Sequence, residues 1–416
     1  MFKNIKSVLP FKKQRLWFWV VLIVLFLFYP YIFADAVFSF HADTRIILVL
    51  LFLFFPLAML LTPRKMPWPL TLSLAVMIIG GVAHFLHTGD KYYYHRIVTL
   101  LFSYSLLVIV YYKIGLKRFY TIYNKWILIM SIGCFIAMIV AFVGVPPLFE
   151  FVEKSDNRVM YSWLVSCTKA YSGPGSLTRM GGFFDEPGAM GYFACFAIAF
   201  NRLLIKDKRM EWMLLLFTLF TFSFGYILQA IVYVLCFIVF GNNEKRRLPL
   251  LVLLVVLVVG LYATKDTKYN EVYANSIGKV EALFSVDNMM TMESTSREIL
   301  LEDSKRAFES SPIWGVGWNT KGYMGDNFYE TLGKDGIIGF VYQYFPFFLL
   351  LFWGIIRRDY EIIAIVVFLF LSLFHRPLHA FPLNYFIYYS LPVVYYLKVR
   401  ENNGESHKVT IKTIND

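Results

Sequence analysis

Long apolar segments alternate with short polar turns along most of the chain. A helix needs about 20 mostly apolar residues to cross the hydrocarbon core of a bilayer. By this criterion the sequence predicts an all-α polytopic membrane protein with about twelve transmembrane helices. We expect them at residues 16–34, 46–62, 68–87, 97–112, 126–145, 188–205, 211–223, 226–241, 248–263, 336–355, 361–374 and 383–397.

Two of these segments have alternative interpretations. The seventh and eighth are short and are joined by a turn at residues 223–225, so they form either two crossing helices or one re-entrant pair. The first follows basic residues, as a signal peptide does, but residues 16–33 lack a small-residue cleavage site. We therefore expect the first segment to remain as an anchor.

Two connections, residues 146–187 and 264–335, are much longer than the others. Long connections in a compact protein are commonly functional. We expect one membrane domain, residues 1–416, with its chemistry beside these two loops.

The distribution of charge predicts the side of the membrane on which each loop lies. The termini and every second connection hold 24 of the 40 basic and 8 of the 28 acidic residues, a net charge of +16. The remaining 16 basic and 20 acidic residues give −4. Because Lys and Arg collect on the cytoplasmic side, we expect both termini in the cytoplasm and both long loops outside.

The composition agrees with this interpretation. Only 16% of the residues are charged, against about 25% in soluble domains. The net charge of +12 follows from membrane insertion, so no nucleic-acid partner is expected. The four cysteines form no CxxC pair, which predicts neither a zinc site nor a disulfide framework.

The second long loop contains a helix that begins with a capping-box sequence at residues 295–298 and ends near Pro312. Arg297 lies in its first turn, where a cation opposes the helix dipole unless an anion binds there. The alternative is that Arg297 pairs with Glu293 or Glu298.

The end of the first long loop brings Arg179, Asp185 and Glu186 to the start of the sixth segment, where Pro187 suits the first helical position. Asp185 and Glu186 are candidates for a general base. The competing interpretation is that either one caps the helix.

A third polar stretch, residues 325–339, contains Asp326 and Asn327 and leads into the tenth segment. Further basic side chains on the outer face complete the candidate substrate-binding set. These are Lys305 and Arg306 on the helix of Arg297, and His375 and Arg376 in the last outer turn. For His375 an interfacial hydrogen-bonding role competes with substrate binding.

Several kinds of chemistry have no sequence signal. We find no nucleotide-binding loop, dinucleotide fingerprint, serine-hydrolase elbow or metalloprotease motif, so neither a cofactor nor a metal site is expected. The strongest polar groups in the middles of the segments are Gln229 and Gln343. Ion-coupled transporters usually need charged groups or broken helices there, which argues against a transporter.

Three stretches, in this order, resemble the O-antigen polymerase and O-antigen ligase superfamily of bacterial membrane glycosyltransferases. Residues 179–188 resemble its Arg-x-x-Gly stretch before a proline-marked helix. Residues 296–317 resemble its Arg–helix–Pro–Gly-x-Gly segment, and residues 326–339 its His-Asn–aromatic–Gly-x-x-Gly segment. The stretches cover about a tenth of the chain, and the rest is similar in architecture alone.

The resemblance implies a GT-C-like fold in the bacterial inner membrane, with the active site on the extracytoplasmic side. It implies transfer of a glycan from an undecaprenyl-diphosphate carrier to a lipid-linked repeat unit, without a metal. Arg179 and Arg297 are then the binders of the donor diphosphate. Membrane lipids surround the protein, and a chain-length regulator is a compatible protein partner.

One departure favours the polymerase branch. Asp326 stands where ligases of this family have His. The base stays open between Glu186, Asp185 and Asp326. The alternatives are a ligase that uses the same donor and, from another class, a flippase or transporter of lipid-linked oligosaccharides.

The charge asymmetry generates a test of topology. Cysteine introduced at Asn157 should react with a membrane-impermeant thiol reagent in intact cells, whereas cysteine at Asn243 should react only after the cells are lysed. Labelling of the Asn243 variant in intact cells would invert the predicted orientation.

Overall fold

The computed structural model is mostly helical. It describes residues 53–56, 60, 66–152, 159–163, 166–169, 171, 173–175, 177–184, 186–239, 248–267, 270, 273, 296–319, 328–375 and 382–402. The first predicted transmembrane segment and most of the second lie outside these residues.

The helices of the first half overlap the predicted apolar segments, but those that begin at Lys91 and Leu116 start six and ten residues before the predicted positions 97 and 126. Three of the helices end in a π-helical turn. They are α4 (Trp68–Thr88), α5 (Lys91–Ile109) with η1 (Val110–Ile114), α6 (Leu116–Phe142), α7 (Pro187–Phe200) with η2 (Asn201–Ile205), α8 (Lys208–Leu219), and α9 (Phe224–Val234) with η3 (Leu235–Val239). The helices of the second half are α10 (Leu248–Ala263), α13 (Ser296–Ser310), α14 (Phe328–Gln343), α15 (Phe345–Arg357), α16 (Tyr360–His375) and α17 (Pro382–Asn402).

Four described helices are long and apolar enough to cross a membrane, and a fifth span results if α14 and α15, which are bent by 46°, are counted as one. The four are Trp68–Thr88, Lys91–Ile114, Leu116–Phe142 and Pro187–Ile205. Two shorter apolar helices are Gly225–Phe237 and Tyr360–Leu373. The described residues therefore form a helical protein of the membrane type, with fewer full-length spans than predicted, because several of the predicted segments form helices that are too short.

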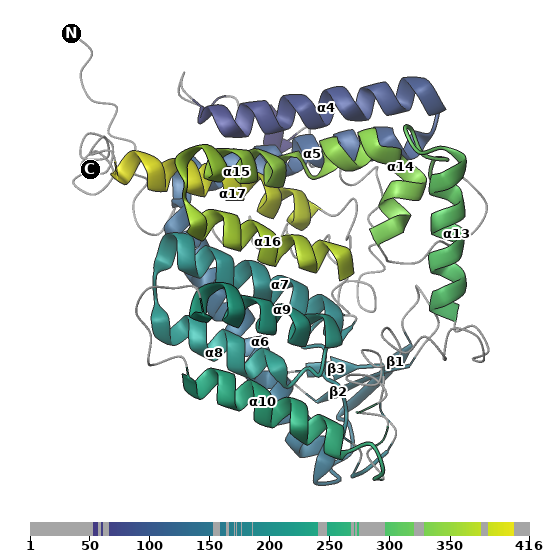
Figure 1. The fold of residues 1–416 in the computed structure, drawn as a ribbon, viewed down its shortest axis with the longest axis vertical. Coiled ribbons are helices and arrows are strands. Elements are labelled where there is room, and N and C mark those ends of the chain that lie inside the picture. The colour runs from purple at the N-terminus through teal and green to yellow at the C-terminus, as the bar shows by residue number, and fades with distance from the viewer. Residues whose placement is uncertain are drawn as a thin grey trace.

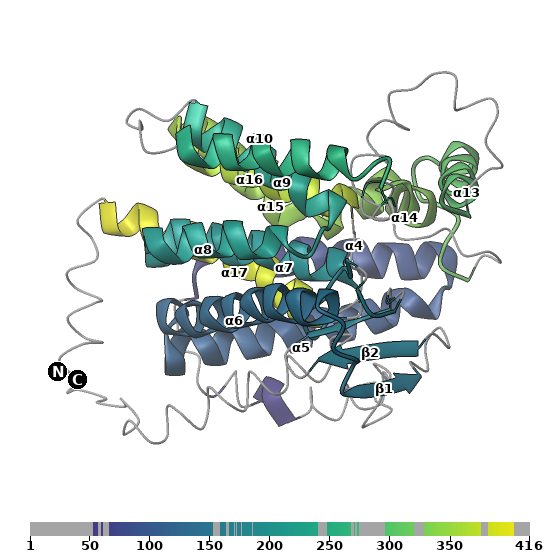
Figure 2. The same ribbon diagram turned by 90° about the horizontal axis from the view of Figure 1, so that it is seen from below.

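The helices lie side by side in one bundle (Figures 1 and 2). α5, α7 and α17 form its interior, and every residue of α7 from Gly188 to Phe200 is buried. α5 packs against α4 and α17, and α7 packs against α6, α8 and α9. Both views place α13 and the small sheet at the same end of the bundle.

The first long loop contains an antiparallel sheet, a departure from the predicted all-α fold. Its strands are β1 (Phe149–Val152), β2 (Val159–Trp163) and β3 (Ser166–Thr168), in the order β1-β2-β3. Phe149 pairs with Ser162, and Tyr161 pairs with Thr168. Side chains that alternate between the two faces of β2 let Met160 and Ser162 turn inward, a pattern of period two that a hydropathy window does not detect.

Cys167 of β3 is buried and donates a hydrogen bond to Ser162 Oγ at 3.3 Å. Burial raises the pKa of its thiol to about 11, and the bond to Ser162 offsets part of that rise. The thiol is therefore protonated at neutral pH. All four cysteines lie in the described part of the chain and are free thiols.

The turn between the seventh and eighth predicted segments differs from its predicted place. α8 ends at Leu219, the chain turns at residues 220–223, and Gly225 lies inside α9. The hydroxyl of Ser223 accepts a hydrogen bond from the backbone N–H of Tyr226 and so caps α9. The capping serine thus sets the helix start, and the glycine does not mark the turn.

An ionic network closes the other end of the bundle. Arg202, in the π-helical turn after α7, bonds Glu211 of α8 at 3.1 Å and Glu361 of α16 at 2.9 Å. Lys398 of α17 lies 2.7 Å from the same Glu361 and 3.6 Å from Asp359. These contacts hold four helices together at the end opposite to α13.

At the α13 end, α14 is interrupted at Gly336, whose φ of +63° and ψ of −172° are not helical. A break leaves backbone groups without helical partners, and in an apolar interior each such group costs several kcal/mol. The loop after α13 supplies the partners. Val316 and Gly317 donate to the carbonyls of residues 333 and 334 at 2.9 Å.

The second half of α14 is bound by the same loop in the opposite direction. The N–H groups of Ile337 and Ile338 donate to the carbonyls of Pro312 and Ile313 at 2.9 and 3.2 Å. The loop and the break therefore form one hydrogen-bonded unit, which we call the elbow and which comprises residues 312–318 and 333–338.

Two glycines allow the elbow to close. Gly315 and Gly336 both have positive φ, and a Cβ atom on either would lie 2.2 to 2.3 Å from a carbonyl oxygen of the facing segment. Such contacts are far inside van der Waals distance. The glycines are therefore required by close backbone approach.

We predict that Gly315→Ala and Gly336→Ala each destabilise the protein by about 2 to 5 kcal/mol, because positive φ and backbone overlap add together. The measurement is thermal unfolding of the purified protein in detergent. The matched control is Gly260→Ala in α10, where an added Cβ meets nothing within 4 Å. Equal unfolding temperatures for all three variants would contradict this account of the elbow.

Candidate functional site

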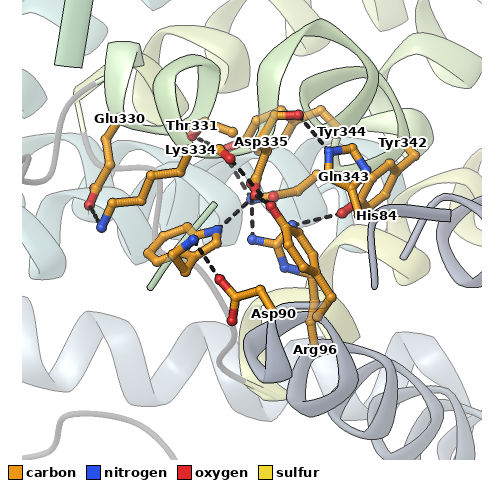
Figure 3. A network of polar contacts seen from close by, with 12 residues as sticks. His84, Asp90, Arg96, Glu330, Thr331, Lys334, Asp335, Tyr342, Gln343 and Tyr344 are labelled. Atoms are coloured by element: carbon orange, nitrogen blue, oxygen red, sulfur yellow. Dashed lines mark hydrogen bonds and ion pairs between the residues drawn. The ribbon is translucent and has the colours of Figure 1, made fainter. Parts of the chain in front are cut away.

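A buried carboxylate, Asp335, lies at the centre of a polar network where α4, α5 and α14 meet the elbow (Figure 3). Its Oδ1 accepts hydrogen bonds from Tyr93 Oη at 2.9 Å and from Trp318 Nε1 at 2.7 Å. Its Oδ2 accepts from Arg96 Nη2 at 3.0 Å. Three donors, one of them a cation, thus satisfy a carboxylate that is fully buried.

Arg96 is equally buried and reaches Asp335 from α5. Its Nη1 donates to the hydroxyl of Tyr342 at 3.0 Å, and its guanidinium lies 5.0 Å from the ring centre of Tyr92. A protein that contains a buried ion pair of this kind is strongly destabilised when one of the two charges is removed.

The positions of Arg96 and Asp335 show that the predicted starts of the fourth and tenth segments are wrong. The sequence places Arg96 and Asp335 just outside the fourth and tenth segments, because charged residues end a hydropathy window. In the structure α5 begins at Lys91 and α14 at Phe328, so both charges lie inside helices. The sequence argument against a transporter, which depended on uncharged segments, is weaker for that reason.

A second carboxylate, Asp90, binds the elbow from the α4–α5 turn. Its Oδ1 caps α5 by accepting from the N–H of Tyr92 at 2.9 Å. Its Oδ2 accepts from the backbone N–H groups of Trp318 and Asn319 at 2.7 and 2.9 Å. Asp90 and Asp335 therefore hold Trp318 from two different helices.

The ring of Trp318 contacts an aromatic ring and a cation. Tyr92 stacks on it with ring centres 4.1 Å apart and an interplanar angle of 17°, and the ammonium of Lys334 lies 4.2 Å from the ring centre. Lys334 also pairs with Glu330 at 3.1 Å, and both side chains are almost fully buried. These contacts hold the half-buried indole in place beside Tyr92 and Lys334.

His84 of α4 completes the network. Its Nε2 lies 3.0 Å from the carbonyl oxygen of Trp314 and 2.8 Å from that of Asp335. Carbonyl oxygens can only accept, so Nε2 carries the proton. The carbonyl of Asp335 lies at the helix break, and His84 supplies the hydrogen bond that the break removes.

The first predicted site segment is a tight turn held against β3. The carbonyl of Arg179 accepts from Thr168 Oγ1 at 2.6 Å, and Cys167 exchanges backbone hydrogen bonds with Gly181 and Gly182 at 2.9 and 2.7 Å. Arg179 is half-buried. The turn thus fixes the place of Arg179 relative to the sheet.

Pro187 occupies the first turn of α7, as predicted, and Glu186 is the N-cap residue. The side chain of Glu186 makes no capping hydrogen bond, so the capping interpretation is wrong for this residue. Asp185 lies outside the described residues.

The structure describes some of the other predicted site residues and not the rest. Arg297 lies in the first turn of α13, and His375 is the last residue of α16. Lys305 and Arg306 are exposed on α13, and Arg306 pairs with Glu302 at 3.1 Å. Asp326, Asn327 and Arg376 lie outside the described residues.

The structure therefore brings together two of the three predicted segments, residues 296–317 and 326–339, through the elbow. Sequence reasoning did not predict the four buried groups His84, Asp90, Arg96 and Asp335. The available signal was the pair of glycine patterns at 315–317 and 333–339, together with charged residues directly beside apolar segments. Among the described residues no cluster of His, Cys, Asp and Glu could hold a metal ion.

The ion pair generates a double-mutant test. We predict that Arg96→Met and Asp335→Leu each destabilise the protein by about 3 to 5 kcal/mol, because each leaves one buried charge without its partner. The double variant should recover much of that loss. The measurement is unfolding in detergent, and strictly additive losses would show that the two charges do not interact.

The chain was also compared with known proteins. No protein-family model matches it, and no curated protein is similar to it in sequence. The interpretation of this site therefore depends on its own geometry and on the sequence patterns described above.

Proposed function

We propose that this protein is a polysaccharide polymerase of the bacterial inner membrane. It transfers a growing glycan from an undecaprenyl-diphosphate carrier to the end sugar of a lipid-linked repeat unit. The α13 end of the bundle faces the extracytoplasmic side in this proposal, and both termini lie in the cytoplasm.

The observation that carries the proposal is the elbow. The resemblance to O-antigen polymerases and ligases depends on two glycine patterns that are separate in sequence. In the structure the glycines of one pattern pack against the backbone of the other. The same close backbone contact therefore explains the glycines of both patterns. This supports treating the two patterns as parts of a single motif.

The chemistry assigns the two arginines to the donor. Negative charge develops on the diphosphate as the glycosidic bond breaks, and fixed guanidinium groups can stabilise it by bidentate hydrogen bonds. Arg179 is held by the turn on β3, and Arg297 lies on α13, at the same end of the bundle (Figures 1 and 2).

The acceptor hydroxyl needs a base within hydrogen-bond reach. Asp335 and Glu330 do not fit this role, because each is buried against a cation. The candidates are Glu186, Asp185 and Asp326. We favour Glu186, whose direction is set by the start of α7 and whose carboxylate does not cap that helix.

The proposal predicts the products made by purified protein that is given lipid-linked repeat units as its only substrate. The wild type should form a ladder of lengthening products. Arg179→Ala and Arg297→Ala should each lower the transfer rate by about 100-fold or more. Arg→Lys should restore little activity, because a point charge does not reproduce the bidentate fork.

Matched controls are Lys305→Ala and Arg306→Ala, which remove exposed cations from the same helix as Arg297. Glu186→Gln should bind substrate but not transfer it. A ladder kept in Glu186→Gln and lost in Asp326→Asn would move the base to Asp326. Transfer that appears only when lipid A core is added would show a ligase, and full activity of both alanine variants would remove the diphosphate role of the arginines.

A further inference from the structure

α13 packs mainly against α14 among the described elements, and Ser304 in the middle of α13 is fully buried. Its side chains at residues 302, 303, 305, 306, 309 and 310 are exposed, and α14 is the helix against which it packs. Its C-terminal end continues into the elbow. The direction of α13 is therefore set by its packing on α14 and by the elbow at its C-terminal end.

Trp318 is the residue that fastens the elbow to a second helix. Its indole binds Asp335 of α14, and its backbone N–H binds Asp90, the N-cap residue of α5. We call this arrangement of Asp90, Trp318 and Asp335 the clamp. Without it, α13 and the elbow would be attached chiefly to α14, which is itself broken at Gly336.

The length of α13 amplifies any movement at the clamp. Arg297 and Ser310 are separated by roughly 20 Å along the helix axis, at 1.5 Å per residue. A rotation of about 10° at the elbow would move Arg297 by about 3 Å over that distance. Displacements of about 1 Å can reduce a catalysed rate 100-fold, so the clamp geometry matters for a group at the far end.

We propose that the clamp is a positioning device: Asp90 and Asp335 hold Trp318 and thereby fix the place of Arg297 at the far end of α13. The assignment of Arg297 to the donor diphosphate rests on the proposed function, whereas the positioning of α13 does not. Asp90, Trp318 and Asp335 are positioning residues in this proposal and do not contact the reacting atoms.

The test weakens the clamp without removing its bulk. Trp318→Phe keeps the ring that stacks on Tyr92 but removes the N–H that binds Asp335, which retains Arg96 and Tyr93 as partners. Asp90→Asn keeps the cap on α5 but weakens the hold on the elbow. The matched controls are Trp353→Phe in α15 and Asp207→Asn, because Asp207 caps α8 in the same way and lies away from the clamp.

The first readout is the distance between spin labels on cysteines introduced at Glu302 and Lys117, measured by pulsed electron paramagnetic resonance on the full chain. Both positions are exposed, and the four native thiols are buried or half-buried. We expect one narrow distance distribution for the wild type and the controls. The combined Trp318→Phe/Asp90→Asn variant should broaden it by several ångströms, and Trp318→Phe alone by less.

The second readout is binding of undecaprenyl diphosphate. The clamp variant and Arg297→Ala should each weaken binding about tenfold, and the combination should weaken it no further, because both act through Arg297. Thermal unfolding checks that each variant is folded, and Trp318→Phe alone replaces the double variant should that one fail to fold.

An unchanged distance distribution in the folded clamp variant would overturn the proposal. So would a broadened distribution with normal binding, provided that Arg297→Ala does weaken binding. If the distribution broadens and Arg297→Ala binds as the wild type does, the clamp stands as the device that positions α13. In that case it is the diphosphate role of Arg297 in the proposed function that fails.

Discussion

The interruption of α14 at Gly336 is the constraint on which the α13 end of the molecule depends. A broken helix inside an apolar bundle leaves donors and acceptors that water cannot reach. Here the loop 312–317 forms backbone hydrogen bonds with four of them, and His84 donates to the carbonyl of Asp335. The break is stable because a second segment of the chain forms hydrogen bonds with the backbone groups that the break leaves without helical partners.

The same break explains why charge is present in the interior. Asp335 directly precedes Gly336 and binds three donors from α5 and the elbow. Arg96 neutralises it at 3.0 Å, and the remaining contacts are aromatic hydroxyls and rings. The polar groups form a closed set that joins α4, α5, α14 and the elbow. That arrangement is suited to holding these helices and the elbow in place. The reacting groups of the proposed mechanism are not members of this network.

Much of the helical organisation could be predicted from the sequence, because apolar runs of the right length are a strong signal. The predicted segments at 68–87 and 248–263 agree with α4 and α10 to within one residue. The predicted boundaries were wrong at α5, α6 and α14. At α5 and α14 a charge was taken as the end of a helix, although its partner lies in the other helix. The sheet was not predicted because its three strands are only three to five residues long, too short to appear in a hydropathy window.

The candidate site was less predictable for a related reason. Arg179, Glu186 and Arg297 carry local signals, namely a glycine turn, a proline and a capping box. Asp90 carries only the local signal of a helix cap and Trp318 carries none, and the contact between the two joins residues 228 positions apart. Such long-range pairs follow from tertiary packing, and one sequence alone contains no record of them.

The separation between Arg96 and Asp335 also has a consequence for biosynthesis. The two residues are 239 positions apart, so at about 5 to 20 residues per second Arg96 is made some 12 to 50 seconds before its partner. During that interval the guanidinium has no anion beside it, and a long basic side chain near a helix end can extend to the membrane interface. The ion pair between α5 and α14 therefore forms only after α14 has been synthesised. The newly made N-terminal half therefore passes through a stage in which α5 can pack against α4 but still lacks α17 and the carboxylate of Asp335.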